Sequence, residues 1–318
     1  STIIGANTRK YHGLLVAPLK VPGMRHLILS KLDESICVNG EKFDLYTNLC
    51  KNYISEGYKF QESFAKEFYP EFVYKAGGVK IAKKIVMIYE KNTVIINYTV
   101  KNDNSDELVM TIAPIMNFRD FHSMTTNHNF NVIQEISDKI TINIDGNIPI
   151  YLKCDDSNYI RHDNDNFKNM YYLKEEERGF FPEEDLCVPG RFEIEIGSKK
   201  KKEINIIVSL DEDIDNIDCQ KAFEAEEERI NQIVKNAKII DNKTNLTKQE
   251  KDRNEFLKDL IIASDNFVIN RPKINLHSII AGYPWFLDWG RDTAISFEGL
   301  LLITKRYDLA REILLNLT

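Results

Sequence analysis

The stretch Ser35-Ile-Cys-Val-Asn-Gly-Glu-Lys-Phe43 decides the fold of the first two thirds of the chain. Apolar and polar residues alternate on both sides of Asn39-Gly40, a dipeptide that tolerates the positive φ angles of a type I′ turn. The pattern therefore predicts a β-hairpin. Gly77-Gly78 and Asp145-Gly146 also separate alternating segments, and they predict two more hairpins.

This alternation of β-branched and aromatic residues continues from residue 1 to about residue 210. No helical period interrupts it, which favours antiparallel sheets over a parallel sheet interleaved with helices. We therefore expect an antiparallel β-sandwich over residues 1–212. The run from Lys199 to Lys202 lies between two expected strands, where we predict a solvated hairpin turn.

A polar segment follows at residues 213–246. It contains a short charged stretch at 222–234 that reads as a helix, and then the run Asp241-Asn-Lys-Thr-Asn245. Charged and turn-forming residues of this kind are typical of a connection between domains. We therefore expect residues 213–246 to be a helical linker.

The period becomes helical beyond the linker. Thr247 and Glu250 form a capping-box pattern at the start of a helix of about 20 residues. Asp292-Thr293 suits the N-cap of a second helix, and a third begins near Asp308. Each helix carries an apolar face that needs neighbours, so residues 247–318 are predicted to be the incomplete start of an all-α domain.

Composition narrows the class of protein. The 318 residues are 43% hydrophobic, which is enough for a substantial core, and the formal net charge is −7. Nucleic-acid binding needs clustered Lys and Arg, so a neutral partner fits better than a nucleic acid. No apolar run approaches the ~20 residues that span a bilayer, so no membrane is expected as a partner.

The cysteines indicate neither a disulfide framework nor a zinc site. The five are an odd number and are scattered without CxxC spacing. Reduced thiols in a cytoplasm are therefore the expectation. The sequence also contains no G-x-S-x-G, G-x-G-x-x-G or P-loop pattern. We expect no cofactor and no metal.

The densest chemical pattern is Ala281-Gly-Tyr-Pro-Trp-Phe-Leu-Asp-Trp-Gly-Arg-Asp-Thr293, which holds both tryptophans of the chain. Aromatic side chains can cover the apolar C–H face of a sugar ring, and the adjacent Arg291 and Asp292 can bond its hydroxyl groups. A buried tryptophan pair with an Arg–Asp bridge that pins a loop would use the same residues. The residues alone leave both interpretations open.

This stretch closely resembles the entry to the catalytic domain of bacterial- and archaeal-type glycogen debranching enzymes with amylo-α-1,6-glucosidase activity. Ala263-Ser-Asp-Asn-Phe267 is also similar to the helix end in that family. Gly5-Ala-Asn-Thr-Arg9 and Arg9-Lys-Tyr-His-Gly-Leu-Leu-Val-Ala17 resemble the opening of the family's N-terminal β domain. Further segments that fit the same family are Glu177-Arg-Gly179, Asp185-Leu186 and Pro189-Gly190.

The resemblance implies a supersandwich-like β domain followed by an (α/α)6 barrel, of which residues 247–318 would be the first helices. Glucoamylases, more distant relatives, carry a Trp-x-Arg-Asp segment whose Arg and Asp bind the terminal glucose. Carried over, Trp289, Arg291 and Asp292 bind glucose in the −1 subsite, and Trp285 is an aromatic wall beside them. The implied partner is glycogen or another branched α-glucan.

The resemblance leaves the catalytic residues unassigned. An inverting glycosidase needs an acid and a base whose carboxyl groups lie roughly 6.5–9.5 Å apart. In the family these belong to later barrel helices, which implies that both lie beyond residue 318 and that these residues alone are inactive. A carboxylate beside Arg291 is expected to stay ionised, so Asp292 suits a hydroxyl acceptor better than a proton donor.

Three other features have a structural interpretation. Asp288 is expected to anchor its loop. His12, in Tyr-His-Gly, is expected to be a neutral imidazole bonded to a backbone group in a turn, and a contribution of the β domain to the wall of the catalytic funnel is the alternative. The run Glu175-Glu-Glu-Arg-Gly179 is expected to be a solvated face, and an interdomain contact is the alternative.

Two alternatives to a debranching enzyme stay open at this point. Another (α/α)6-barrel glucosidase or a glycoside phosphorylase would share the architecture and differ in the barrel. A glycan-binding module without catalysis would share the aromatic and charged residues.

Overall fold

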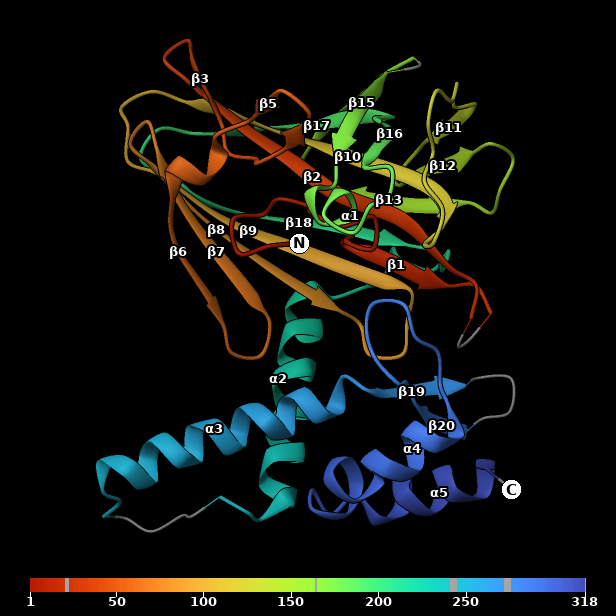
Figure 1. The fold of residues 1–318 in the computed structure, drawn as a ribbon. Coiled ribbons are helices and arrows are strands. Elements are labelled where there is room, and N and C mark those ends of the chain that lie inside the picture. The colour runs from red at the N-terminus through yellow and green to blue at the C-terminus, as the bar shows by residue number, and fades with distance from the viewer. Residues whose placement is uncertain (21–22, 164, 241–244, 272–275, 318) are drawn as a thin grey trace. The chain divides into compact units, whose positions relative to one another are not determined.

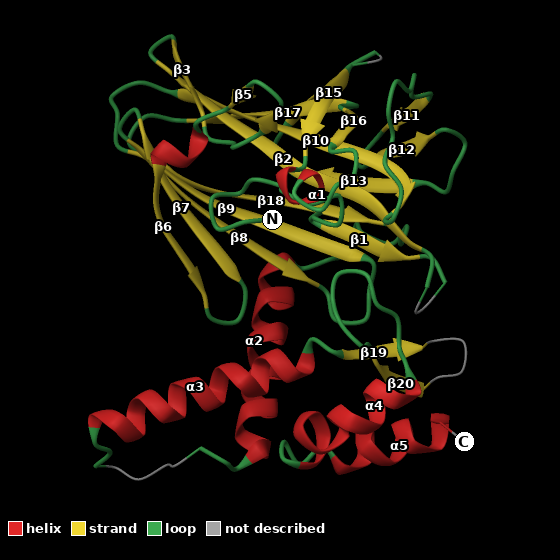
Figure 2. Ribbon diagram, in the orientation of Figure 1, coloured by secondary structure: helices red, strands yellow, loops and turns green. Residues whose placement is uncertain are grey.

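A computed structural model of the chain describes residues 1–20, 23–163, 165–240, 245–271 and 276–317 (Figure 1). The chain forms two compact units, which are considered separately. The β unit comprises Ser1–Ala17 and Arg25–Ala222, and the helical unit comprises Pro18–Met24 and Phe223–Thr318. Strands dominate the first unit and helices the second (Figure 2).

The first sheet of the β unit has ten strands among the described residues. Its neighbours run in the order β1, β2, β10, β16, β15, β4, β5; in addition, β3 pairs with β2, and β17 pairs with β10 and β14. The strands are β1 (Leu15–Pro18), β2 (Arg25–Val38), β3 (Glu41–Asp44), β4 (Leu49–Cys50), β5 (Tyr53–Ile54), β10 (Leu108–Asp120), β14 (Asn158–Arg161), β15 (Asn166–Tyr171), β16 (Glu183–Cys187) and β17 (Gly190–Ile196).

The second sheet has eight strands in the described part of the chain, in the order β11, β12, β13, β18, β9, β8, β7, β6. They are β6 (Gln61–Lys66), β7 (Pro70–Ala76), β8 (Val79–Met87), β9 (Thr93–Asn102), β11 (Val132–Ile136), β12 (Ile140–Ile144), β13 (Ile150–Cys154) and β18 (Lys201–Ser209). Two short helices, η1 (Gly57–Phe60) and α1 (Leu173–Glu176), interrupt the strands. Among β2 to β18, strands that are neighbours in these two sheets pair in the antiparallel orientation.

One hydrophobic core joins the two sheets. Inward residues of β2, β10 and β17 belong to the same buried cluster as those of β7, β8, β9, β12, β13 and β18. Alternation places these side chains on one face of each strand, as in β18, where Ile204, Ile206 and Val208 are buried. This arrangement of mostly antiparallel sheets is consistent with the predicted N-terminal β-sandwich.

All three predicted hairpins are confirmed. Asn39 and Gly40 have φ angles of 51° and 80°, and Gly77 and Gly78 have 52° and 73°, so both turns contain the two positive φ values of a type I′ turn. Asp145-Gly146 also has two positive φ angles, although its connection runs on to β13 at Ile150. Turn chemistry was therefore a reliable local signal.

The prediction of a hairpin at Lys199 to Lys202 is wrong. β17 pairs with β10 and β14 in the first sheet, whereas β18 pairs with β13 and β9 in the second. The connection therefore crosses from one sheet to the other, and Lys201 and Lys202 already belong to β18. Alternation with a period of two predicts which side chains share a face of a strand. It does not predict which other strand pairs with that strand.

The helical unit contains most of α2, then α3, a small β-hairpin and two further helices. Its elements are α2 (Cys219–Ala237), α3 (Lys248–Asp265), β19 (Val268–Arg271), β20 (Leu276–Ile279), α4 (Gly290–Phe297), the π-helical turn η2 (Glu298–Leu302) and α5 (Tyr307–Leu317). Buried residues Ile279, Leu301, Ala310 and Ile313 form its core. Within the described residues, none of the helices is long and apolar enough to cross a membrane.

The capping box at the start of α3 is confirmed: the Thr247 side chain accepts from Glu250 N–H, and Glu250 bonds back to Thr247 N–H. The apolar face of this helix is only partly covered by the described residues. Ile261 is buried, but Phe256 and Leu260 are exposed. The hairpin β19–β20 was not predicted, because its strands are short. Part of the expected linker, residues 241–244, lies outside the described residues.

Candidate functional site

Residues 280–289 form a closed loop between β20 and α4, and all four predicted sugar-binding residues lie on it or directly after it. Ile280 and Asp288 form an antiparallel bridge across its base. One step further in, Ala281 N–H donates to Leu287 O at 2.8 Å. These bonds hold both ends of the loop, so its aromatic residues are presented from a fixed backbone.

Asp288 anchors this loop to the small hairpin. Its carboxylate accepts a hydrogen bond from Ser278 Oγ at 2.8 Å and forms an ion pair with Arg271. The Asp288 side chain is only 12% exposed. These contacts agree with the structural interpretation of Asp288.

The four predicted residues differ in exposure. Trp289 is 57% exposed, and the side chain of Arg291 is 80% exposed. Arg291 Nη2 lies 3.5 Å from Asp292 Oδ2, so the structure brings this pair together. Trp285 is half-buried against Phe286, with ring centroids 6.0 Å apart. An exposed indole and guanidinium are therefore presented beside a carboxylate at the start of α4.

The prediction that Asp292 or Thr293 caps this helix is wrong. Trp289 occupies the N-cap position without a side-chain cap bond, and α4 begins at Gly290. Asp292 lies inside the first turn, where the helix dipole favours a negative charge. The sequence placed the start of the helix within three residues, and the carboxylate is left available for another partner.

A buried carboxylate that the sequence did not single out holds the helices of this unit together. Asp265, at the end of α3, accepts from Arg229 of α2 at 2.5 Å and from Arg306 at 2.7 Å. Ser264 Oγ also accepts from Arg306 at 2.9 Å. Burial lowers the pKa of Arg229, but Glu226 and Asp265 outweigh it and raise that pKa above its ordinary value. The Ser264-Asp265 segment is therefore a structural clamp.

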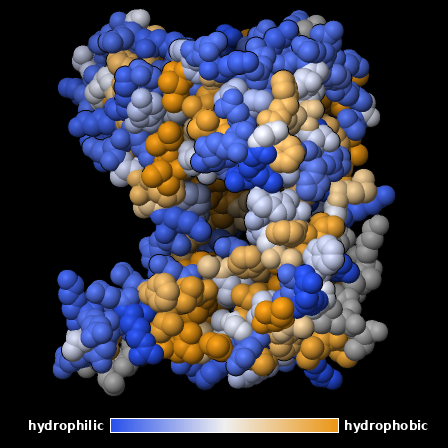
Figure 3. Space-filling view, viewed as in Figure 1, coloured by the Kyte–Doolittle hydropathy of each residue, from blue (hydrophilic) through white to orange (hydrophobic). Residues whose placement is uncertain are grey.

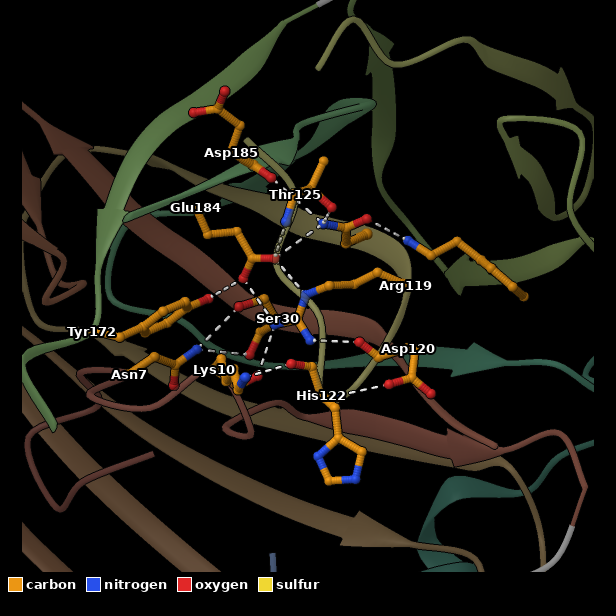
Figure 4. Close-up of polar contacts among 12 residues, drawn as sticks. Asn7, Lys10, Ser30, Arg119, Asp120, His122, Thr125, Tyr172, Glu184 and Asp185 are labelled. Carbon is orange, nitrogen blue, oxygen red and sulfur yellow. Dashed lines mark hydrogen bonds and ion pairs between the residues drawn. The ribbon is translucent and has the colours of Figure 1, made fainter. Parts of the chain in front are cut away.

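The β unit contains a buried polar cluster that sequence reasoning also missed (Figure 4). Glu184 is fully buried and forms an ion pair with Arg119. Tyr172 Oη and Thr125 N–H also donate to this carboxylate, at 2.5 and 3.1 Å. Burial, followed by the charge of Glu184, raises the pKa of Tyr172 well above its ordinary value, so the phenol remains a donor. Glu184 stands in an acidic run that resembles a solvated surface, so the sequence carried no signal for its burial.

Two other sequence interpretations can be checked in the β unit. His12 Nδ1 accepts from Thr8 N–H at 3.1 Å, and burial with neighbouring positive charges lowers the pKa of His12 to about 4. A neutral, backbone-bonded imidazole is thus confirmed. The expectation of a solvated face at 175–179 is partly wrong, because Glu175 is fully buried with Arg178 Nη1 at 3.4 Å.

Both ends of the chain match known protein families. Residues 1–203, more than half of the sequence, match the family described as glycogen debranching enzyme N terminal. The chain belongs to the glycogen debranching enzyme family. Residues 262–318 match the family described as amylo-alpha-1,6-glucosidase. The loop at 280–289 and the helix that follows it lie within this second match.

Solved structures similar to this debranching-family chain are distant. A bacterial glucoamylase complexed with acarbose has 13% identity and a TM-score of 0.36, and the alignment covers 92% of this chain and 52% of that one. A protein described as a kojibiose phosphorylase from the human microbiome has 8% identity and a TM-score of 0.30, with 75% and 28% covered. A 4-alpha-glucanotransferase from Thermococcus litoralis has 10% identity and a TM-score of 0.31, with 60% and 28% covered.

The debranching-family chain spans about half the length of that glucoamylase and little more than a quarter of the other two proteins. No curated protein matches the sequence. The family assignment rests on the two sequence matches. Within the described residues, no group of three or more His, Cys, Asp or Glu side chains is arranged to hold a metal ion.

Proposed function

We propose that this chain is part of a glycogen debranching enzyme that hydrolyses α-1,6-glucosidic branch points of glycogen or limit dextrin. The observation that carries the proposal is the pair Arg291–Asp292 beside Trp289, on a family-matched segment. We further propose that the paired catalytic carboxylates are outside these 318 residues. The work of this segment is then to hold the terminal glucose.

The anchoring of the loop favours sugar binding over a structural clamp for these residues. Trp289 and Arg291 are 57% and 80% exposed, which leaves both side chains accessible to a ligand. The loop is already anchored by Asp288 through Ser278 and Arg271. In the proposed site Trp289 covers the C–H face of glucose, Trp285 lies beside it, and Arg291 and Asp292 bond hydroxyl groups as donor and acceptor.

We propose that residues 247–318 are the opening of an (α/α)6 barrel, that residues 1–212 are the β-sandwich and that residues 213–246 are the linker between them. Apolar side chains that are exposed over these helices support this proposal (Figure 3). Helices of a barrel bury such faces against their neighbours. The exposed apolar residues are Phe256, Leu260, Ile295, Leu302, Ile303, Leu314 and Leu315.

The proposed reaction proceeds with inversion at the anomeric carbon. One carboxylic acid protonates the leaving oxygen of the α-1,6 bond, and a carboxylate activates a water molecule on the opposite face of the sugar. The product is then β-glucose. The proposal includes a location in the cytoplasm, which is compatible with the five free cysteines.

The test uses the intact protein that contains these residues and a phosphorylase limit dextrin as substrate. We expect release of free glucose, initially as the β anomer in a proton NMR time course, and no product from the 318-residue chain alone. Glucose 1-phosphate formed only in the presence of inorganic phosphate would instead make the protein a phosphorylase. Binding of the dextrin without any product from the intact protein would make it a glycan-binding module.

A further inference from the structure

Three segments of the β unit that are distant in sequence meet on one surface. Lys174 N–H donates to Thr8 O at 2.9 Å, which ties α1 to the N-terminal segment. Tyr11 Oη lies 3.2 Å from His122 Nδ1, which ties the same segment to the end of β10. The segments around Tyr11 and around residues 177–179 were both singled out by family resemblance, and the proposed glucose site uses neither.

Exposed rings gather where these segments meet. Phe180 and Phe181 are 53% and 58% exposed, and His122 is exposed beside the half-buried Tyr11. The Tyr11 and His122 rings are 5.7 Å apart at 85°. Lys10 Nζ lies 5.4 Å from the Tyr11 centroid and 5.8 Å from that of Phe180. We call these five residues the ring surface.

The buried cluster of Figure 4 holds the backbone at two residues of the ring surface, Lys10 and His122. Arg119 Nη2 donates to Lys10 O at 2.7 Å, and Arg119 Nη1 donates to Asp120 O at 3.1 Å. His122 N–H donates to Asp120 Oδ1 at 2.8 Å. Because Arg119 is held by the buried Glu184, the residues on either side of the surface are positioned before any ligand arrives.

The chemistry of the ring surface suits an uncharged, hydroxyl-rich ligand. Two adjacent phenylalanines on a turn expose apolar faces that can stack on pyranose rings. Lys10 has three N–H donors, one of which is used by His122 O, and the others can reach hydroxyl groups. Arg178 is paired with Glu175. Burial is the largest cause that lowers the pKa of His122, which favours a neutral imidazole able to donate or accept.

We propose that Lys10, Tyr11, His122, Phe180 and Phe181 form a second carbohydrate-binding surface, which takes an unbranched α-1,4-linked glucose chain of the glucan. This inference rests on the proposed function, because it assumes an α-glucan as substrate. It adds a site on the β unit that holds the polymer, separate from the residues that hold the terminal glucose. An aqueous anion is a poorer occupant, because the exposed Phe180 and Phe181 faces offer it no hydrogen bond and Arg178 is already paired with Glu175.

The test is calorimetric titration of the 318-residue chain with maltoheptaose. We expect the double variant F180A/F181A to weaken the affinity on the order of 10-fold, because two stacking faces are lost. F180Y/F181Y retains both rings and should bind within about threefold of the parent chain. Tyr53→Ala removes an aromatic of the β unit that is also exposed, in β5, and should leave the affinity unchanged. Far-UV circular dichroism and thermal unfolding confirm that each variant is folded.

The outcomes separate this proposal from the proposed function. Because maltoheptaose ends in a glucose that can also reach the proposed glucose site, the titrations are repeated in the Arg291→Ala background. The binding that remains there should still be weakened on the order of 10-fold by F180A/F181A. Unchanged affinity in F180A/F181A, or no binding of maltoheptaose by the parent chain at millimolar concentration, would overturn the ring surface even if the intact protein releases glucose from limit dextrin. A change of oligomeric state in F180A/F181A with unchanged glucan affinity would identify a protein interface and also overturn it.

Discussion

Replacement of Glu184 by Gln tests how strongly the buried cluster stabilises the β unit. Glu184 is fully buried, and its two oxygens accept from Arg119, Tyr172 and Thr125. A glutamine keeps the shape but places an NH2 group against one of these donors, and it removes the charge opposite a guanidinium that is only 5% exposed. Loss of one partner of a buried ion pair costs about 3–5 kcal/mol.

The assay is urea unfolding followed by far-UV circular dichroism. With a slope of roughly 2–3 kcal/mol per molar for a domain of this size, the midpoint should fall by roughly 1–2 M. Glu195→Gln is the matched control, since Glu195 is exposed on β17, the next strand in sequence, and it should change stability by less than about 0.5 kcal/mol. A Glu184→Gln midpoint equal to that of the control would refute the reasoning.

Other predictions address the helical unit, the N-terminal turn and the glucose site. Asp265→Asn should cost roughly 3 kcal/mol, because two guanidinium groups lose their common charged partner; tryptophan fluorescence during urea unfolding measures this, and a loss below about 1 kcal/mol would contradict the clamp. The pKa of His12 is lowered to about 4, so the unfolded state binds a proton first and stability should fall from about pH 6.5 to about pH 4. His12→Asn keeps an acceptor without titrating, and its stability should depend less on pH in that window; an unchanged slope would exclude His12 as the cause. In the intact enzyme, Trp289→Ala should lower kcat/KM on limit dextrin more than Trp289→Phe, which retains an aromatic face. Equal losses in the two variants would argue against stacking.

Local signals in the sequence were sufficient where one short segment decides the structure. The turn at Asn39-Gly40 and the capping box at Thr247 depend on residues a few positions apart, and both are confirmed. The β-sandwich follows from many such hairpins. The crossing between β17 and β18 could not be derived in this way, because alternation is the same whether a strand pairs with its neighbour in sequence or with a distant one.

The sequence also did not predict the pairing of charged residues that are distant from one another along the chain. Glu184 meets Arg119, and Asp265 meets Arg229, across separations of 65 and 36 residues. Each carboxylate stands among polar neighbours, so a single sequence gives no reason to expect its burial. The site motif at Trp285–Asp292 was identifiable because its aromatic and charged residues are contiguous, although its role in binding sugar stays a prediction.

Arg291 and Asp292 are proposed to bind the terminal glucose of a branch by hydrogen bonds to its hydroxyl groups. The most direct measurement is kcat/KM on phosphorylase limit dextrin for Arg291→Ala in the intact enzyme, with thermal unfolding of the same variant. Loss of one charged hydrogen-bond partner in a partly dry site costs on the order of 2–4 kcal/mol, which is a fall of roughly 30- to 1000-fold at an unchanged melting temperature. Arg291→Lys should not restore activity, because an ammonium lacks the planar fork of the guanidinium. Near-normal kcat/KM in Arg291→Ala, or a loss that only follows melting of the protein, would contradict the account.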